Sequence, residues 1–166
     1  PDLRRYPTWQ ERARSLAEDR FGTLTKIAFI EPVAWDMEGN LYAKSLTHES
    51  VESPSLYQVV RIDANGESHV VASPNWGHMD GVEGQERYST INALTVGPDR
   101  NIYVADGNLN TGSWIRRFAP DGTLTTMAGS NEVGFADGKG DEARFFLPSG
   151  LAADQAGNLY VADPVN

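Results

Sequence analysis

Two segments of this chain repeat each other in register. Residues 92–106 read NALTVGPDRNIYVAD, and residues 149–163, fifty-seven positions later, read SGLAADQAGNLYVAD. A third and looser copy, VAWDMEGNLYA, occupies residues 33–43. Similarity at a fixed period near sixty residues indicates an array of structural units, in which each unit buries its apolar surface against its neighbours.

Each repeat begins with two short segments that read as β-strands. The first, such as residues 93–96, ends in a turn rich in Gly, Pro, Asp and Asn. The second, such as residues 101–105, is the apolar run IYVA, or LYVA in the last repeat, which is typical of a strand covered on both faces. The repeat therefore opens with an antiparallel pair of strands.

Two further segments complete the repeat. Residues 57–62 and 114–118 predict third strands, and residues 68–72 and 123–128 predict fourth strands. Asn65-Gly66 and Asp121-Gly122 lie between them, and these dipeptides are strong hairpin signals because their residues tolerate positive φ. Four antiparallel strands with apolar residues on both faces predict sheets that stack radially, as β-propeller blades do.

The N-terminal residues follow a different pattern. Thr8 and Glu11 form a capping box, and Trp9, Ala13 and Leu16 then recur at helical spacing. We expect a short amphipathic helix within residues 1–20 that covers a larger body. Residues 23–28, TLTKIA, resemble the fourth-strand segment TLTTMA and predict a strand that belongs to a blade whose other strands lie elsewhere.

A connector of about twenty residues follows each fourth strand. Both connectors contain G-x-x-D-G and then an arginine beside an aromatic residue, Arg87-Tyr88 in the first and Arg144-Phe145 in the second. Loops of this length are usually functional or packed on themselves. Because the pattern is repeated, we expect it to have a structural role.

The chain resembles the NHL-repeat β-propellers. The resemblance is greatest over residues 137–166, DGKGDEARFFLPSGLAADQAGNLYVADPVN, and covers residues 21–166, although Lys44 and Ser45 replace the Ala-Asp of the later repeats. It implies a strand at 23–28, blade one at 33–72, blade two at 92–128 and a partial blade three at 149–166. Family members commonly have six blades and act as binding scaffolds, and some relatives are lyases or hydrolases with a metal in the central channel.

Several residues are candidates for ligand contact. Trp76 and His78 in the first connector have no counterpart of similar type in the second, and unmatched residues on a repeated frame are where specific function is grafted. Packing of such an aromatic residue on its own loop is the alternative. Asp106 and Asp163 follow the apolar run, and each either contacts a ligand or accepts backbone hydrogen bonds in the next turn.

Metal and cofactor motifs give only partial matches. Asp106, Asn108 and Asn110 supply alternating oxygen ligands that suit calcium, but the later Gly and Glu of the helix-loop-helix calcium site are absent. Residues 138–143 match G-x-G-x-x-A, yet no strand directly precedes them and two acidic residues would repel a pyrophosphate. The three histidines show no metal-binding spacing.

Composition narrows the function. No apolar run approaches the roughly 18 residues of a membrane span. A net charge of −9 disfavours nucleic acid, cysteine is absent, and no G-x-S-x-G elbow occurs. We expect a non-catalytic binding or assembly module that presents loops to a protein or carbohydrate partner. The alternative is a metal-dependent lactonase or lyase. The compartment is not fixed, although an extracellular or periplasmic (secreted) protein is favoured.

The repeat count predicts an incomplete ring. Six units of this period need about twice the 166 residues given. We therefore expect the chain either to be a fragment of a larger propeller or to complete one with a second chain. An uncovered blade would expose an apolar face and an unpaired strand edge, which promote association with other chains. Light scattering at micromolar concentration should detect association or aggregation, and a stable monomer would contradict this expectation.

Overall fold

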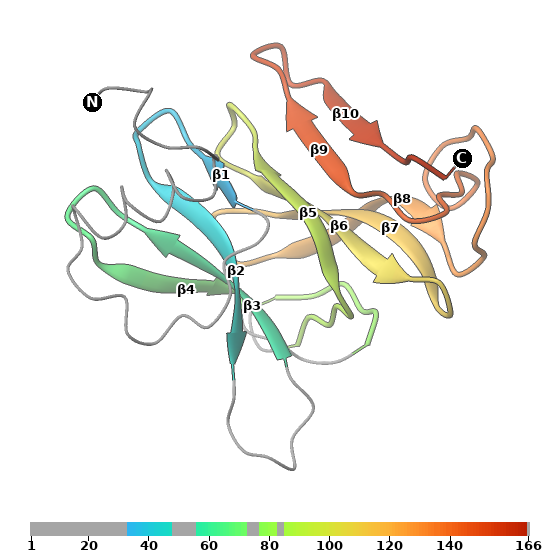
Figure 1. The fold of residues 1–166 in the computed structure, drawn as a ribbon, viewed down its shortest axis with the longest axis horizontal. Helices are drawn as coiled ribbons and strands as arrows, with labels where there is room; N and C mark the ends of the chain where they lie inside the picture. The colour runs from blue at the N-terminus through green and yellow to red at the C-terminus, as the bar shows by residue number, and fades with distance from the viewer. Residues whose placement is uncertain (1–32, 48–55, 73–76, 83–84, 166) are drawn as a thin grey trace, which may run out of the picture.

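The computed structural model describes residues 33–47, 56–72, 77–82 and 85–165, in which ten strands form three antiparallel sheets (Figure 1). The strands are β1 (Val33–Trp35), β2 (Leu41–Thr47), β3 (Leu56–Ile62), β4 (Ser68–Ala72), β5 (Ile91–Val96), β6 (Ile102–Asn108), β7 (Gly112–Phe118), β8 (Leu124–Ser130), β9 (Gly150–Ala153) and β10 (Leu159–Ala162). The expected helix within 1–20, the expected strand at 23–28 and Trp76 lie outside these residues.

The sheets follow the repeat order of the sequence. Sheet one has the order β1-β2-β3-β4, sheet two has the order β5-β6-β7-β8, and sheet three pairs β9 with β10. This confirms the expected all-β class with four-stranded antiparallel sheets for the described residues. The same residues include no helix with the length and apolar character needed to cross a bilayer.

The predicted hairpin turns lie where β3 meets β4 and where β7 meets β8. Gly66 and Gly122 have φ values of 89° and 83°, which an L side chain rarely adopts. The backbone N–H of Gly66 donates to the carbonyl of Asp63 at 3.0 Å, and that of Gly122 donates to Ala119 at 2.9 Å. The glycine in each turn therefore permits the reversal.

Both four-stranded sheets contain an irregularity at the same place. The β3–β4 ladder shifts register between Val59 and Val60, and the β7–β8 ladder shifts between Ile115 and Arg116. These positions are equivalent, since each lies just before the arginine that faces the tyrosine of the second strand. A bulge increases local twist, so the two sheets share one shape as well as one strand order.

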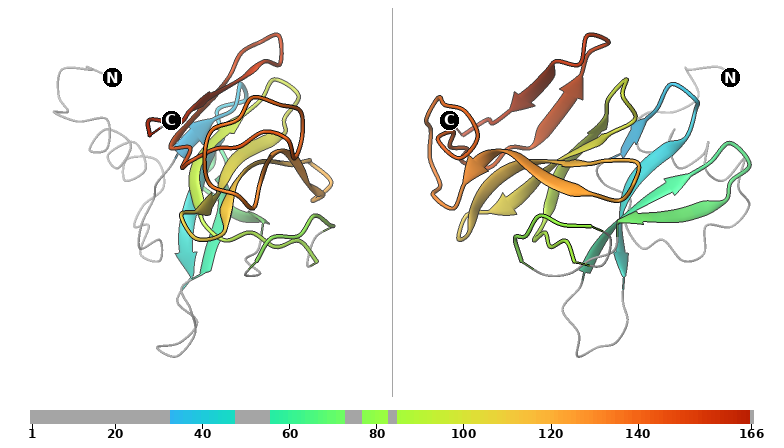
Figure 2. Two further views of the ribbon diagram at one scale, coloured as in Figure 1. Left: turned by 90° about the vertical axis from the view of Figure 1, so that its right-hand side faces the viewer. Right: turned by 180° about the vertical axis from the view of Figure 1, so that it is seen from behind.

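Apolar side chains fill a layer between each pair of successive sheets. Tyr42 and Val59 of sheet one pack with Ile102, Val104 and Phe118 of sheet two. The first strands lie side by side, β1 against β5 and β5 against β9 (Figure 2). Full burial of an aliphatic side chain such as Val104 stabilises the fold by about 1.5–3 kcal/mol.

The second layer is smaller and leaves one face of sheet three open. Leu159 and Val161 pack towards Ala105 and Ile115 of sheet two. Tyr160, between them in sequence, is 60% exposed, whereas the equivalent Tyr103 is 9% exposed. The apolar run is therefore covered on both faces in β6, as predicted, but on one face only in β10.

The connectors are packed on themselves, as the repeated motif predicted. Met79 bridges Arg87 in the first connector, and Ala136 bridges Arg144 in the second, fifty-seven residues later. Tyr88 is 2% exposed in the layer between sheets one and two, where its hydroxyl donates to a carbonyl of β3 at 2.6 Å. The aromatic residue of the connector therefore completes the core between two sheets.

Arg116 fastens the first connector to sheet two. Its side chain is fully buried, and its Nη1 donates to Asp106 Oδ2 at 2.8 Å and to the Arg87 carbonyl at 2.7 Å. Its Nη2 donates to the Met79 carbonyl and to Asp80 Oδ1, both at 2.9 Å. A charge removed from water costs several kcal/mol unless it is paired, and these four acceptors offset that cost.

We expect Asp106→Ala to lower the free energy of unfolding by about 3–5 kcal/mol, because it removes the fully buried one of the two carboxylates that pair with the Arg116 guanidinium. Denaturant unfolding followed by circular dichroism would measure the change. The exposed Asp141→Ala is the control and should have little effect. The double change Asp106→Leu with Arg116→Met should recover most of the loss, and an Asp106→Ala variant as stable as the parent would contradict this role.

Candidate functional site

Three equivalent turns meet at one pocket. Each turn follows the first strand of its sheet, after β1, β5 and β9. Together they enclose a shallow cavity of about 220 Å³, which we call the turn pocket. Its lining consists of matching triplets from the three repeats: Trp35, Asp36 and Met37; Val96, Gly97 and Pro98; Ala153, Asp154 and Gln155.

An aspartate holds each turn together. Asp36 Oδ1 accepts the backbone N–H groups of Glu38 and Asn40 at 2.9 and 2.8 Å. Its Oδ2 accepts the Asn40 side-chain amide at 2.6 Å and the Tyr42 hydroxyl at 3.3 Å. Burial acts to raise the pKa of Asp36, but the hydrogen bonds from Asn40, Glu38 and Tyr42 outweigh it and lower that pKa.

Asp154 repeats this arrangement in the third turn. It accepts the backbone N–H groups of Ala156 and Asn158 at 2.9 and 2.8 Å, and the Tyr160 hydroxyl at 3.2 Å. The hydrogen bond from the Asn158 side chain, together with the backbone donors, lowers the pKa of Asp154. Both carboxylates are therefore ionised at neutral pH.

The second turn reaches the same geometry from a different position. Gly97 stands where the other turns have aspartate, and Asp99 instead accepts the Tyr103 hydroxyl at 2.8 Å. A Cβ atom on Gly97 would lie 2.5 Å from Asp99 Oδ1, so the glycine makes room for the displaced carboxylate. Arg100 occupies the left-handed position, with φ of 64°, and pairs with Glu38 of the first turn.

Two large apolar side chains stand at the turn pocket without matching residues in the other repeats. Trp35 is 46% exposed and Met37 is 82% exposed, whereas the third turn has Ala153 and Gln155 at these positions. Sequence reasoning missed both residues. The criterion used for Trp76 and His78 would have identified them, because each differs in residue type from the equivalent positions of the other repeats.

Of the residues predicted to face a ligand, His78, Asp106 and Asp163 do not line this pocket. The ring of His78 stacks on that of Trp114, with centroids 3.9 Å apart and planes 21° from parallel. His78 is therefore packed on β7, which corresponds to packing within the protein, the alternative to ligand contact. Trp76, the other connector candidate, lies outside the described residues.

Asp106 and Asp163 each accept two backbone N–H groups from the preceding connector. Asp106 Oδ1 accepts those of Ser89 and Thr90 at 2.8 and 3.2 Å. Asp163 accepts the equivalent pair, from residues 146 and 147, at 2.7 and 3.0 Å. The strand β6 extends past Asp106 to Asn108, so Asp106 lies inside the strand and is 1% exposed. For both aspartates this geometry corresponds to the acceptance of backbone hydrogen bonds, the alternative to ligand contact.

The side-chain oxygens of Asp106 and Asn108, two of the three residues proposed for calcium, have partners within the protein. Both carboxylate oxygens of Asp106 accept hydrogen bonds, one from residues 89 and 90 and the other from Arg116. Asn108 Oδ1 accepts the backbone N–H groups of Asn110 and Thr111 at 2.9 and 3.2 Å. A calcium site at Asp106, Asn108 and Asn110 stays a prediction.

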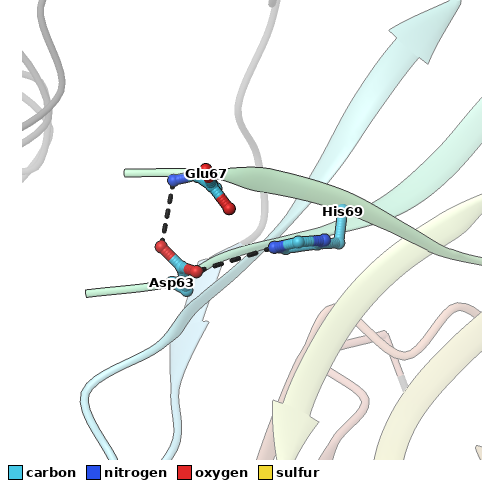
Figure 3. Close-up of side chains that lie close together, drawn as sticks. All are labelled: Asp63, Glu67 and His69. Atoms are coloured by element: carbon cyan, nitrogen blue, oxygen red, sulfur yellow. Dashed lines mark hydrogen bonds and ion pairs between the residues drawn. The ribbon is translucent and has the colours of Figure 1, made fainter. Parts of the chain in front are cut away.

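A different set of ligand types gathers on the β3–β4 hairpin. Asp63, Glu67 and His69 each offer one ligand atom, and these atoms lie within 4.8 Å of one another (Figure 3). His69 Nε2 lies 3.6 Å from Asp63 Oδ2, and Asp63 Oδ1 accepts the Glu67 backbone N–H at 3.0 Å. In the described part of the chain this is the one such group of three. Sequence reasoning missed it because the hairpin, rather than a fixed spacing, brings the residues together.

No family model matches the chain, and no curated protein matches it.

His78 gives the connector a pH dependence. Partial burial lowers the pKa of His78, and the positive charge of Arg116 lowers it further against the opposing charges of Asp106 and Asp80. The unfolded chain therefore binds a proton more readily, and stability falls as the pH drops through the unfolded value of about 6.5. Between pH 7 and pH 5 we expect the parent to lose more unfolding free energy than His78→Asn. Equal losses in denaturant titrations of the two proteins would contradict this prediction.

Proposed function

We propose that this chain is part of an NHL-like β-propeller and that it binds a protein partner at the turn pocket. In this proposal residues 33–72 and 92–128 are two blades, and residues 149–166 begin a third. The function is binding rather than catalysis. One observation supports it above the others: three equivalent turns converge on a single pocket beside exposed apolar side chains.

The arrangement of the sheets supports the propeller. A propeller places four-stranded antiparallel blades around a central channel. Here two four-stranded sheets share one strand order and one bulge position. Their first strands adjoin each other and β9. On this interpretation the turn pocket lies at one end of the channel, where the blades come closest together.

The chemistry of the pocket favours a protein partner. Methionine and aromatic residues are enriched at protein interfaces, and a flexible methionine adapts to irregular surfaces. Met37 and Trp35 provide both, with Asp154 beside them. A volume of about 220 Å³ is small for a drug-sized ligand but suits one inserted side chain. The exposed tryptophan ring with neighbouring carboxylates suits an apolar or cationic side chain.

The turn aspartates support binding over catalysis. A general base needs a pKa near the working pH, whereas hydrogen bonds from Asn40 and Asn158 help to lower the pKa values of Asp36 and Asp154. Each carboxylate also holds the hydroxyl of its own tyrosine, Tyr42 or Tyr160. These side chains are suited to keeping the pocket rigid, which reduces the entropic cost of binding.

Selection from a random peptide library on the purified protein would test the pocket as a binding site. We expect the enriched peptides to compete with one another for one site, and Trp35→Ala to weaken their binding by about tenfold or more, as loss of an aromatic hot spot does. Binding would be measured by fluorescence anisotropy of labelled peptides. Met37→Ala should weaken binding in the same direction.

The control is Val70→Ala, which truncates an exposed apolar side chain on β4, away from the turn pocket. It should leave peptide affinity unchanged. Peptides that bind the Trp35→Ala protein as tightly as the parent would reject the turn pocket as the site. A glycan array run on the same variants provides the second arm, and glycan binding that requires Trp35 would assign a carbohydrate partner instead.

A further inference from the structure

The turn pocket has acidic lining residues and, among the described residues, no basic ones. Asp36 and Asp154 line it from the first and third turns, and the lining includes no Lys, Arg or His. A second cavity of about 420 Å³ shares Asp36 with the turn pocket but is also lined by Arg61, His69 and Arg100. Of these two cavities, the turn pocket is therefore the one whose charge favours a cationic occupant.

The two carboxylates of the turn pocket are ionised, and in the described part of the chain neither forms an ion pair. Arg100, on the second turn, pairs with Glu38 instead. The negative charges of Asp36 and Asp154 are therefore stabilised by neutral hydrogen-bond donors but are not neutralised by a cation. The net charge of −9 over the whole chain adds to the attraction for positive groups.

The acceptor sites of both carboxylates are filled by their own turns. Asp36 accepts four hydrogen bonds, two from backbone N–H groups, one from the Asn40 amide and one from the Tyr42 hydroxyl. Asp154 accepts the equivalent four from residues 156, 158 and 160. An ionised carboxylate has about four lone-pair sites. The carboxylates of the turn pocket therefore attract a cation through their charge rather than through a direct hydrogen bond.

This constraint favours arginine over lysine as the occupant. The lysine ammonium is a compact and strongly hydrated ion, whereas the guanidinium is more weakly hydrated and stacks on aromatic faces. Trp35 supplies an aromatic ring at the pocket, and Met37 supplies an apolar surface. A guanidinium beside an indole gains cation–π attraction, and the aliphatic part of an arginine packs on apolar surface such as Met37.

We propose that the turn pocket binds an arginine side chain of the protein partner, with the guanidinium against Trp35 and near the carboxylates of Asp36 and Asp154. This inference rests on the proposed function and identifies the partner group that enters the pocket. An apolar side chain in the same place would remove water from two carboxylates without supplying a counter-charge, which costs free energy. Charge complementarity therefore decides between the two kinds of occupant.

Peptides that the random library yields and that require Trp35 are the first probes. We expect them to contain an arginine whose replacement by citrulline, a neutral side chain of nearly the same shape, weakens binding at least about tenfold. Replacement by lysine should weaken binding less, because the charge is kept, and replacement by norleucine should weaken it as much as citrulline does. As a second probe, N-acetylarginine amide at about 10 mM should displace a labelled peptide, and N-acetylcitrulline amide should not.

Charge changes at Gln155 test the electrostatic attraction without altering a turn aspartate. Gln155 is exposed and lines the turn pocket. Gln155→Glu should strengthen binding of the arginine peptides and Gln155→Lys should weaken it, each by about fivefold, since one unit charge is added at close range. The matched control is Gln85→Lys, which changes an exposed glutamine of the first connector that does not line the pocket. It should have a smaller effect on affinity.

The outcomes separate this inference from the proposed function. Trp35-dependent peptides without arginine, or equal binding of the arginine peptides and their citrulline or lysine versions, would overturn the arginine and leave the turn pocket as a protein-binding site. Equal effects of Gln155→Lys and Gln85→Lys would overturn it as well. The peptide comparisons use the unaltered protein, so they hold even if a variant fails to fold. If no peptide depends on Trp35, the proposed function is rejected and this inference with it.

Discussion

The ion pair between Arg116 and Asp106 is the contact that joins the first connector to sheet two. It is fully buried, and the same guanidinium holds two connector carbonyls and Asp80. The connector carries the chain from sheet one to sheet two, so this one side chain ties the incoming segment to the second sheet. Both Nη groups of Arg116 have acceptors, and its buried Nε has none among the described residues. Sheet one has Ser45 and Val60 at these places, so its connection is made without the pair.

The repeat in the sequence predicted the fold well, because period and turn chemistry are local properties. The hairpin dipeptides Asn65-Gly66 and Asp121-Gly122 lie at the turns they predicted. Strand ends were less accurate, since β6 continues past the apolar run through Asp106 to Asn108. Its extension is stabilised by pairing with β7, a non-local contact that the composition of the segment does not reveal. The helix and strand expected before residue 33 lie outside the described residues.

The candidate site was less accessible to sequence reasoning. Trp35 and Met37 flank a turn whose sequence predicted only a chain reversal. Their place in a pocket depends on two other turns that are distant in sequence. The group of Asp63, Glu67 and His69 was missed for the same reason, since pairing across a hairpin sets its distances. Conversely, Asp106 stood out because Asp163 repeats it, yet both of these aspartates bind connector backbone.

In the second turn the aspartate that accepts the tyrosine hydroxyl stands at a different sequence position from its equivalents, and the hydrogen bond is nevertheless made. Asp99, two residues further along the loop, accepts the hydrogen bond of the Tyr103 hydroxyl. Gly97 has no side chain that would clash with Asp99, and Arg100 adopts a left-handed backbone conformation. With these three residues the second turn keeps the carboxylate–tyrosine hydrogen bond of the other two turns. Turns of this kind can therefore differ in residue type and still make the same hydrogen bond, so the hydrogen bonds identify equivalent turns better than the aligned residues do.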